Sequence, residues 1–364
     1  MSEGDHDGIL PPRANPALVG HEDAERLLAE AYASGRLHHA VLITGPKGIG
    51  KATLAFRFAR FVLAGGGDAQ GRDARDPSPL ALDVGHPVFR RVASGGHADL
   101  RTLERTIDPR SERLRGEIVV SDVREAGRFL RLSPAEAGWR VVVVDSVDEM
   151  NTNAANAMLK FLEEPPPQAL ILLVSHRPGR LIATIRSRCR RLELRPLGEA
   201  AVLALLAAGR PQLSAAERAT LARLSEGRIG RALELADSGG AELYREMTGV
   251  LGGLPRLDVR AIEGLCDRIA GAGAERAYGA LTSLLLWWLG RLVRATALAA
   301  WPEDEPPHGP MRRLADGRNL DRWLEAWEKI NRLFGQAEWA NLDKRQVVVS
   351  AFLALEGTAR PRAP

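Results

Sequence analysis

The chain has few cysteines, few lysines and no long apolar run. Its 364 residues contain two cysteines, Cys189 and Cys266, too few for a disulfide framework or a four-cysteine zinc site. The longest apolar stretch, LTSLLLWWLG at 281–290, is about half the length needed to span a bilayer. The first residues, MSEGDHDG, are acidic and polar, unlike a signal peptide. These observations argue against a disulfide-rich secreted protein or a membrane-spanning protein, and we expect a cytoplasmic location.

Basic residues are almost all arginine, with 45 arginines, five lysines and a formal net charge of +4. Such a bias is typical of genome composition, so it is weak evidence for binding to DNA. It does make one segment stand out, because Lys47 and Lys51 lie close together in a glycine-rich stretch. The length exceeds one ordinary core and predicts two or three domains.

Residues 45–53 read GPKGIGKAT, which is a phosphate-binding loop of the G-x-x-x-x-G-K type. A buried strand (40–45) precedes it and a helix (52–65) follows, which is the context that this motif requires. Glycine N–H groups of such a loop converge on phosphate oxygens, and the lysine reaches the β- and γ-phosphates. The alternative is a relic loop that keeps its shape for packing and holds nucleotide loosely at most. The candidate nucleotide-binding residues of the loop are Gly45, Gly48, Gly50 and Lys51.

Two working parts of an ATPase are replaced. Ala52 stands where a Ser or Thr hydroxyl would coordinate Mg²⁺. Thr53 is a candidate substitute, but one helical residue turns it by about 100°. Asp145 ends the apolar run 141–144 and is either a Walker B carboxylate or a capping residue at a strand end. Ser146 follows it, where a catalytic Glu would be expected, and a hydroxyl cannot polarise water as a carboxylate does.

Two further candidates lie at the ends of later segments. Ser175 follows the apolar strand 169–174, where it can contact a γ-phosphate or simply end the strand. Residues 185–194, IRSRCRRLEL, hold four arginines. They form either a solvated basic face or a site at which Arg188 acts in trans on the ATP of a neighbouring subunit. An arginine aimed at the developing phosphate charge contributes roughly 10³–10⁵ in rate.

Apolar strands alternate with helices in the first part of the chain, which predicts a doubly wound α/β domain. From about residue 199 the chain is helical, and six of its seven tryptophans lie between 287 and 339. Large aromatics on helices suit packing in a core or across an interface. The predicted strands are 40–45, 116–120, 139–145, 169–175 and 188–197, and the predicted parts are a loose arm (1–14), the α/β domain (15–197), a helical lid (198–242) and a helical collar (243–358).

Several segments together resemble the clamp-loader branch of the AAA+ proteins, and in particular the delta-prime family of bacterial DNA polymerase III. They span most of the chain, and the pairing of SRC with NAMLKFLEEPP is highly specific. The resembling segments are LVGHEDAERLL (18–28), LHHAVLITGPKGIGKAT (37–53), VVVVDSVDEMNTNAANAMLKFLEEPP (141–166), LLVSHRPGRLIATIRSRCRRLELRPL (172–197) and NLDKRQVVVSAFLAL (341–355).

The resemblance implies an AAA+ P-loop NTPase-like domain, a helical lid and an all-α collar that joins a five-subunit ring. Arg188 matches the arginine finger and Ser175 matches sensor 1, whereas Gly230 stands in place of the sensor 2 arginine, with Arg231 beside it. The implied partners are the ATPase subunits and delta in a hetero-pentameric ring and, through the complex, the sliding clamp and primer-template DNA. Zinc is not expected, because residues 66–116 lack cysteine.

We therefore expect a stator-like subunit with a weak or vestigial ATP/ADP site, absent or weak ATP hydrolysis and an arginine donated to its neighbour. Polymerisation would reside in another subunit. The alternative is an active motor subunit in which Thr53 and Asp148 substitute for the lost groups. A third interpretation is an interaction scaffold in which even Arg188 is inert.

Overall fold

The computed structural model describes residues 10–66, 76–108, 112–136, 138–269, 274–301, 309–315, 320–340 and 342–360. The chain divides into two compact units, 1–232 and 233–364. Of the predicted N-terminal arm, residues 1–9 lie outside the described residues. No described helix combines the length and the apolar character needed to cross a bilayer.

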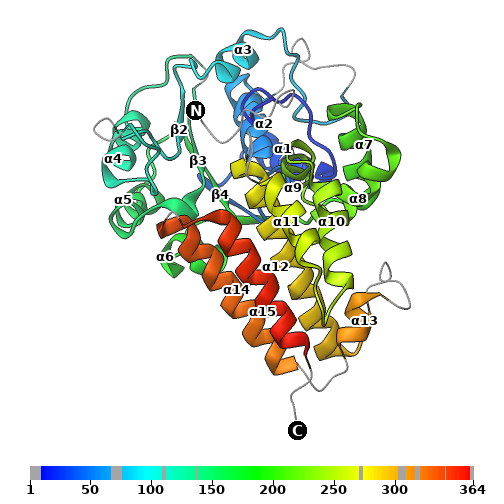
Figure 1. The fold of residues 1–364 in the computed structure, drawn as a ribbon. Helices are drawn as coiled ribbons and strands as arrows, with labels where there is room; N and C mark the ends of the chain where they lie inside the picture. Colours follow the sequence, from blue (N-terminus) through cyan, green and yellow to red (C-terminus); the bar gives the residue numbers. More distant parts are fainter. Residues whose placement is uncertain are drawn as a thin grey trace. The chain divides into compact units, whose positions relative to one another are not determined.

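The first unit is built on a parallel five-stranded sheet with the order β2-β3-β4-β1-β5 (Figure 1). The sequence-based α/β fold class is therefore confirmed. Because helices cover both faces, the central strands are buried along their whole length, which explains their continuous apolar runs. The strands are β1 (Ala40–Thr44), β2 (Leu100–Leu103), β3 (Arg140–Asp145), β4 (Ala169–Ser175) and β5 (Arg190–Glu193).

Alternate strand residues point into two separate cores, one on each face of the sheet. Val41 and Ile43 pack with α1 (Glu22–Ala33), α2 (Lys51–Leu63) and α3 (Pro87–Ala93). On the other face Leu42 packs with residues of three helices. These helices are α4 (Val120–Leu130), α5 (Thr152–Glu163) and α6 (Ala183–Ser187). The two helix groups lie on opposite sides of the sheet in Figure 1.

One predicted strand was wrong. Residues 116–120 form no named strand: Ile118 makes an isolated bridge to Met150, and α4 begins at Val120. Ile118 is apolar because it lies in the core beneath that helix, with no exposed surface. The strand that lies beside β3 at the edge of the sheet is β2, a four-residue strand whose half-exposed sequence, LRTL, gave no apolar signal.

The described residues after β5 form helices and their connections, as predicted. The segment 198–242 contains helices α7 (Glu199–Gly209), α8 (Ala215–Ser225) and α9 (Ile229–Asp237). In the second unit Trp288 and Trp323 are each 1% exposed and form part of an all-helical core. Its helices are α10 (Gly240–Gly252), α11 (Val259–Arg268), α12 (Ala274–Leu298), α13 (Pro310–Leu314), α14 (Leu320–Ala340) and α15 (Lys344–Ala359).

Candidate nucleotide site and arginine finger

The candidate nucleotide residues converge at the carboxyl edge of the sheet. Thr44, the last residue of β1, is in register with Ser175 at the end of β4. Asp145, which ends β3, is in register with Val174 of β4. The phosphate-binding loop begins immediately after β1, so the loop, Asp145 and Ser175 come from three neighbouring strands. This edge is where open parallel sheets bind ligands.

Two glycines of the loop are required by close backbone neighbours. Gly45 has φ +143°, and a Cβ there would lie 2.5 Å from the Leu194 carbonyl oxygen. The Gly48 carbonyl accepts a hydrogen bond from Gly230 N–H at 2.8 Å. A Cβ on Gly230 would stand 2.9 Å from Gly48 Cα. Gly230, which stands in place of a sensor 2 arginine, is therefore in direct backbone contact with the phosphate-binding loop.

Lys51 opens α2 and is 2% exposed. Its Nζ donates a hydrogen bond to the Pro46 carbonyl of the same loop. Burial lowers the pKa of Lys51 to about 8, against the opposing effect of Asp145 and Asp148. A desolvated ammonium group with a single hydrogen bond would gain from an anion, and phosphate is the anion that this loop type binds.

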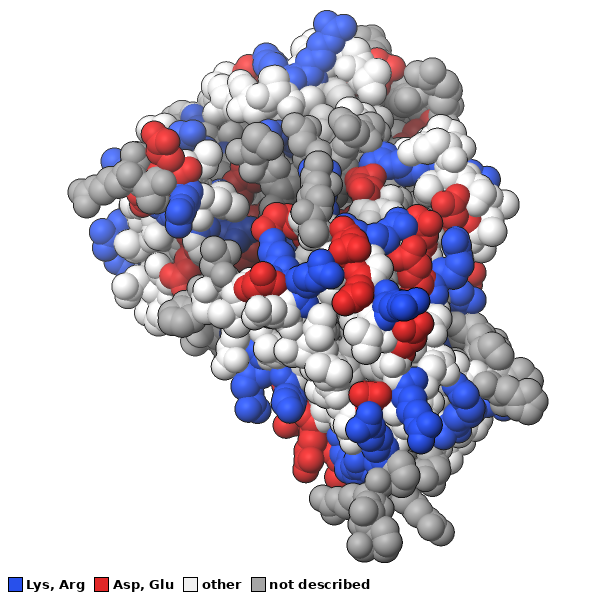
Figure 2. All heavy atoms as spheres, viewed as in Figure 1, with Lys and Arg blue, Asp and Glu red and all other residues white. Residues whose placement is uncertain are grey.

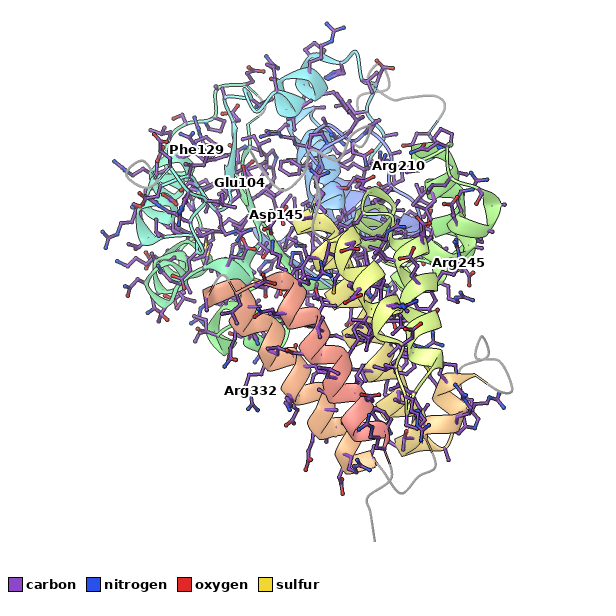
Figure 3. The ribbon with its side chains drawn as sticks, viewed as in Figure 1. Glu104, Phe129, Asp145, Arg210, Arg245 and Arg332 are labelled. Carbon is purple, nitrogen blue, oxygen red and sulfur yellow. The ribbon has the colours of Figure 1, made fainter. Side chains whose placement is uncertain are left out.

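Asp145 is a partly buried carboxyl at the end of β3. Burial raises its pKa to about 6, Glu104 and Glu149 raise it further, and Lys51 acts in the opposite direction. Glu104 follows β2 and Asp145 ends β3, and both are labelled in Figure 3. Three carboxyl groups therefore lie near one another at the carboxyl ends of the strands, and a bound cation or proton would reduce the repulsion between them.

The carboxylate of Asp148 is fully engaged at the end of β4. It accepts hydrogen bonds from Ser175 Oγ at 2.9 Å, from His176 N–H and from Arg177 N–H at 3.3 Å. Ser175 is completely buried, and its hydroxyl hydrogen is used in this contact. Ser146 Oγ is buried and finds no hydrogen-bond partner within the described part of the chain. The roles predicted for Asp145 and Ser175 at a nucleotide remain predictions.

Helix α1 supports the loop through residues that sequence reasoning did not select. His21 Nε2 lies 2.7 Å from the Ile49 carbonyl oxygen. Glu25 forms an ion pair with Arg57 of α2 at 2.7 Å, with both side chains at most 2% exposed. These contacts join α1 to the loop and to the helix that follows it. Thr53 lies on the same helix and is 8% exposed.

Arg188 lies at the amino ends of the parallel strands, opposite the carboxyl ends that carry the phosphate-binding loop. It caps α6 just before β5, and β5 begins with Arg190 in register with Val41. The phosphate-binding loop starts at Gly45, four strand positions beyond Val41, which corresponds to about 13 Å, and Arg188 precedes β5 by two residues. Its guanidinium donates a hydrogen bond from Nη1 to the Thr184 carbonyl at 3.2 Å, and Nη2 forms an ion pair with Glu163 Oε1 at 2.9 Å.

His86 and His97 accept hydrogen bonds from nearby backbone N–H groups, and Cys189 is partly buried. His86 caps α3 by accepting from Val88 N–H at 3.2 Å, and His97 Nδ1 accepts from Asp99 N–H at 3.1 Å. Burial raises the pKa of Cys189 to about 12. In the described part of the chain no three His, Cys, Asp or Glu side chains are grouped to hold a metal ion. Figure 2 shows basic and acidic side chains intermixed over the visible face, in keeping with the small net charge.

Comparison with known proteins gives a consistent family. A family model described as "DNA polymerase III, delta subunit" matches residues 20–198. The DNA polymerase III subunit delta' of Pseudomonas aeruginosa is 30% identical over 313 residues, which cover 86% of each chain. The delta' subunit of Escherichia coli is 34% identical over 216 residues, or 58% of each chain.

More distant similarities extend over nearly the whole chain. The DNA polymerase III subunit gamma/tau of Mycobacterium tuberculosis is 27% identical over 96% of this chain and 59% of that protein. A solved gamma subunit-related protein of Thermotoga maritima aligns with a TM-score of 0.41 and 18% identity, covering 93% of this chain and 99% of that one. The Pseudomonas relative and the five-stranded P-loop fold together lead to one conclusion: the chain belongs to the delta' family of DNA polymerase III subunits, among the clamp-loader AAA+ proteins of DNA replication.

Proposed function

We propose that this chain is a stator-like, ATPase-defective subunit of the clamp loader that donates Arg188 to the ATP site of a neighbouring subunit. Its partners in this proposal are ATPase subunits and delta in a hetero-pentameric ring, which loads the sliding clamp onto primed DNA. Residues 15–197 would serve as the ATPase-like domain, 198–242 as the lid and 243–358 as the collar. Polymerisation would belong to another subunit of the holoenzyme.

The position of Arg188 is the observation that carries the proposal. Arg188 precedes β5 at the amino ends of the strands, whereas the phosphate loop follows β1 at their carboxyl ends, about 13 Å or more away. A guanidinium must reach the transferring phosphate to stabilise its charge. Arg188 therefore cannot serve a nucleotide bound by its own chain. It is half-exposed, with 36% of its side chain accessible, and is available to a second subunit.

The chain's own nucleotide site supports the ATPase-defective part of the proposal. Ala52 offers no hydroxyl to Mg²⁺, and Ser146 offers no carboxylate to activate water. The backbone of Gly230 takes the place of a sensor 2 side chain. What remains is a cradle for phosphate made of the loop amides and Lys51. We propose that it binds ATP or ADP weakly, with little dependence on the metal.

An active motor is the competing proposal, and the geometry argues against its two substitutes. Asp148 would have to act as the catalytic carboxylate, yet it accepts hydrogen bonds from Ser175, His176 and Arg177 at the end of β4. Thr53 would have to coordinate Mg²⁺, yet it is nearly buried along α2. The role of Asp148 would require its hydrogen bonds at the end of β4 to break.

Nucleotide titration of the isolated chain with and without Mg²⁺, together with its ATP turnover, tests the ATPase-defective part. We expect the affinity for ATP to change by less than about threefold when the metal is chelated, since the groups that bind Mg²⁺ in P-loop ATPases are incomplete. We expect turnover far below the ~1 s⁻¹ at the low end of ordinary enzymes. Tight metal-dependent binding with turnover near that rate would identify a motor instead.

A further inference from the structure

Arg188 is held by a carboxylate from another helix. A guanidinium has five N–H donors. Nη1 of Arg188 donates a hydrogen bond to the Thr184 carbonyl at 3.2 Å, and Nη2 forms an ion pair with Glu163 Oε1 at 2.9 Å. The other donors are available for the oxygens of a phosphate group. The side chain is therefore oriented before any partner arrives.

Glu163 is a firm anchor because its helix is tightly packed. It is the last residue of α5, and the two residues before it, Phe161 and Leu162, are 8% and 2% exposed in the core beneath the sheet. Three prolines begin two residues later, at 165–167, and keep the chain from continuing as helix. The backbone that carries the Glu163 carboxylate is therefore held in place by the core. Arg188, in contrast, lies in the short turn between α6 and β5.

The ion pair is also weak enough to orient Arg188 without trapping it. The side chains of Arg188 and Glu163 are 36% and 47% exposed. Pairs with this exposure contribute little to stability, because water and salt screen them. A phosphate oxygen can therefore be added to the guanidinium while the carboxylate stays in place.

We infer that Glu163 is the positioning residue of the arginine finger. This inference rests on the proposed function, in which Arg188 acts on the ATP of a neighbouring subunit. Glu163 touches neither the nucleotide nor the reacting atoms; it acts by restricting Arg188 before the ring assembles. Immobilising one long side chain beforehand corresponds to a factor of about 3 to 10 in a rate or binding constant.

The test uses the reconstituted clamp loader and measures DNA- and clamp-stimulated ATP turnover. We expect Glu163→Ala to lower kcat about 3- to 10-fold with an unchanged KM for ATP. Glu163→Gln should retain most of the rate, because its amide oxygen still places an acceptor beside Nη2. Glu164→Ala is the matched control, since Glu164 is an exposed neighbouring carboxylate, and it should behave as wild type. In an Arg188→Ala background, Glu163→Ala should have no further effect.

The outcomes separate this inference from the function on which it rests. A normal rate for Glu163→Ala beside a reduced rate for Arg188→Ala overturns the positioning role alone. A normal rate for Arg188→Ala overturns both. A faster rate for Glu163→Ala would mean that the carboxylate withholds the arginine, which also contradicts the inference. Equal losses for Glu163→Ala and Glu163→Gln, with reduced assembly by gel filtration, would show a structural role in joining α5 to α6.

Discussion

Replacing Asp145 by Asn should stabilise the first unit at neutral pH. Burial, with Glu104 and Glu149 nearby, raises the pKa of this carboxyl from 3.8 to about 6. A shift of this size makes the ionised form cost the folded chain up to roughly 3 kcal/mol. Asparagine keeps the shape and removes the charge, so we expect a gain of about 1–3 kcal/mol at pH 7.

The gain must depend on pH in one direction. Below about pH 4 the carboxyl is protonated in the folded and unfolded chains alike, and the advantage of asparagine should vanish. Between pH 4 and about 6 the unfolded chain ionises first, so the wild type loses stability as the pH rises through the folded pKa. Above that range the difference should be constant.

Hydrogen exchange of the β1 and β3 amides measures this quantity, because the sheet lies within one unit. Asp148→Asn is the control, and it should lower the free energy of unfolding rather than raise it. Its carboxylate accepts three hydrogen bonds, so its loss should cost about 1–3 kcal/mol. An Asp145→Asn variant that is less stable than wild type at pH 7, or equally shifted at pH 4 and 7, would refute the argument from burial.

Three further predictions follow from the loop and its supports. Gly230→Ala should lower the free energy of unfolding by about 1–3 kcal/mol, because its Cβ would meet the loop backbone at 2.9 Å; an unchanged melting temperature would contradict this contact. Glu25→Ala should cost roughly 3–5 kcal/mol by leaving Arg57 buried with fewer partners, whereas exposed Glu22→Ala on the same helix should change urea stability by less than about 0.5 kcal/mol. Affinity for an ADP analogue should fall as pH rises through about 8, where free Lys51 loses its proton; a constant affinity from neutral pH to well above that value would disprove a role for its charge.

The sequence predicted the central part of the fold better than its edges. β1, β3 and β4 are buried on both faces, so their apolar runs were visible without any partner. The edge strand β2 is half-exposed and carries polar residues, while the apolar segment around Ile118 lies in the core without belonging to the sheet. Buried segments are apolar in composition, but an apolar composition does not specify which strands pair with each other.

The site shows the same division. The phosphate loop and Asp145 were found because their spacing is local and their strands are buried. The contacts of Ser175 with Asp148 and of Arg188 with Glu163 join residues 27 and 25 positions apart. No periodic pattern reports such pairs, because they depend on how strand ends and helix ends meet in the folded unit. Only the tertiary structure reveals that Asp148 is engaged and that Arg188 faces away from its own loop.

The central claim is that Arg188 completes the ATP site of a neighbour. The most direct test compares the clamp-loading rate of the reconstituted complex with Arg188→Ala and with Arg190→Ala, an exposed arginine two residues further on. A site deprived of its finger should lose roughly 10³-fold or more in hydrolysis, so loading should collapse for Arg188→Ala and stay normal for Arg190→Ala, with assembly intact by gel filtration. Equal loading rates for the two variants and the wild type would contradict the claim and leave the chain as a structural member of the ring.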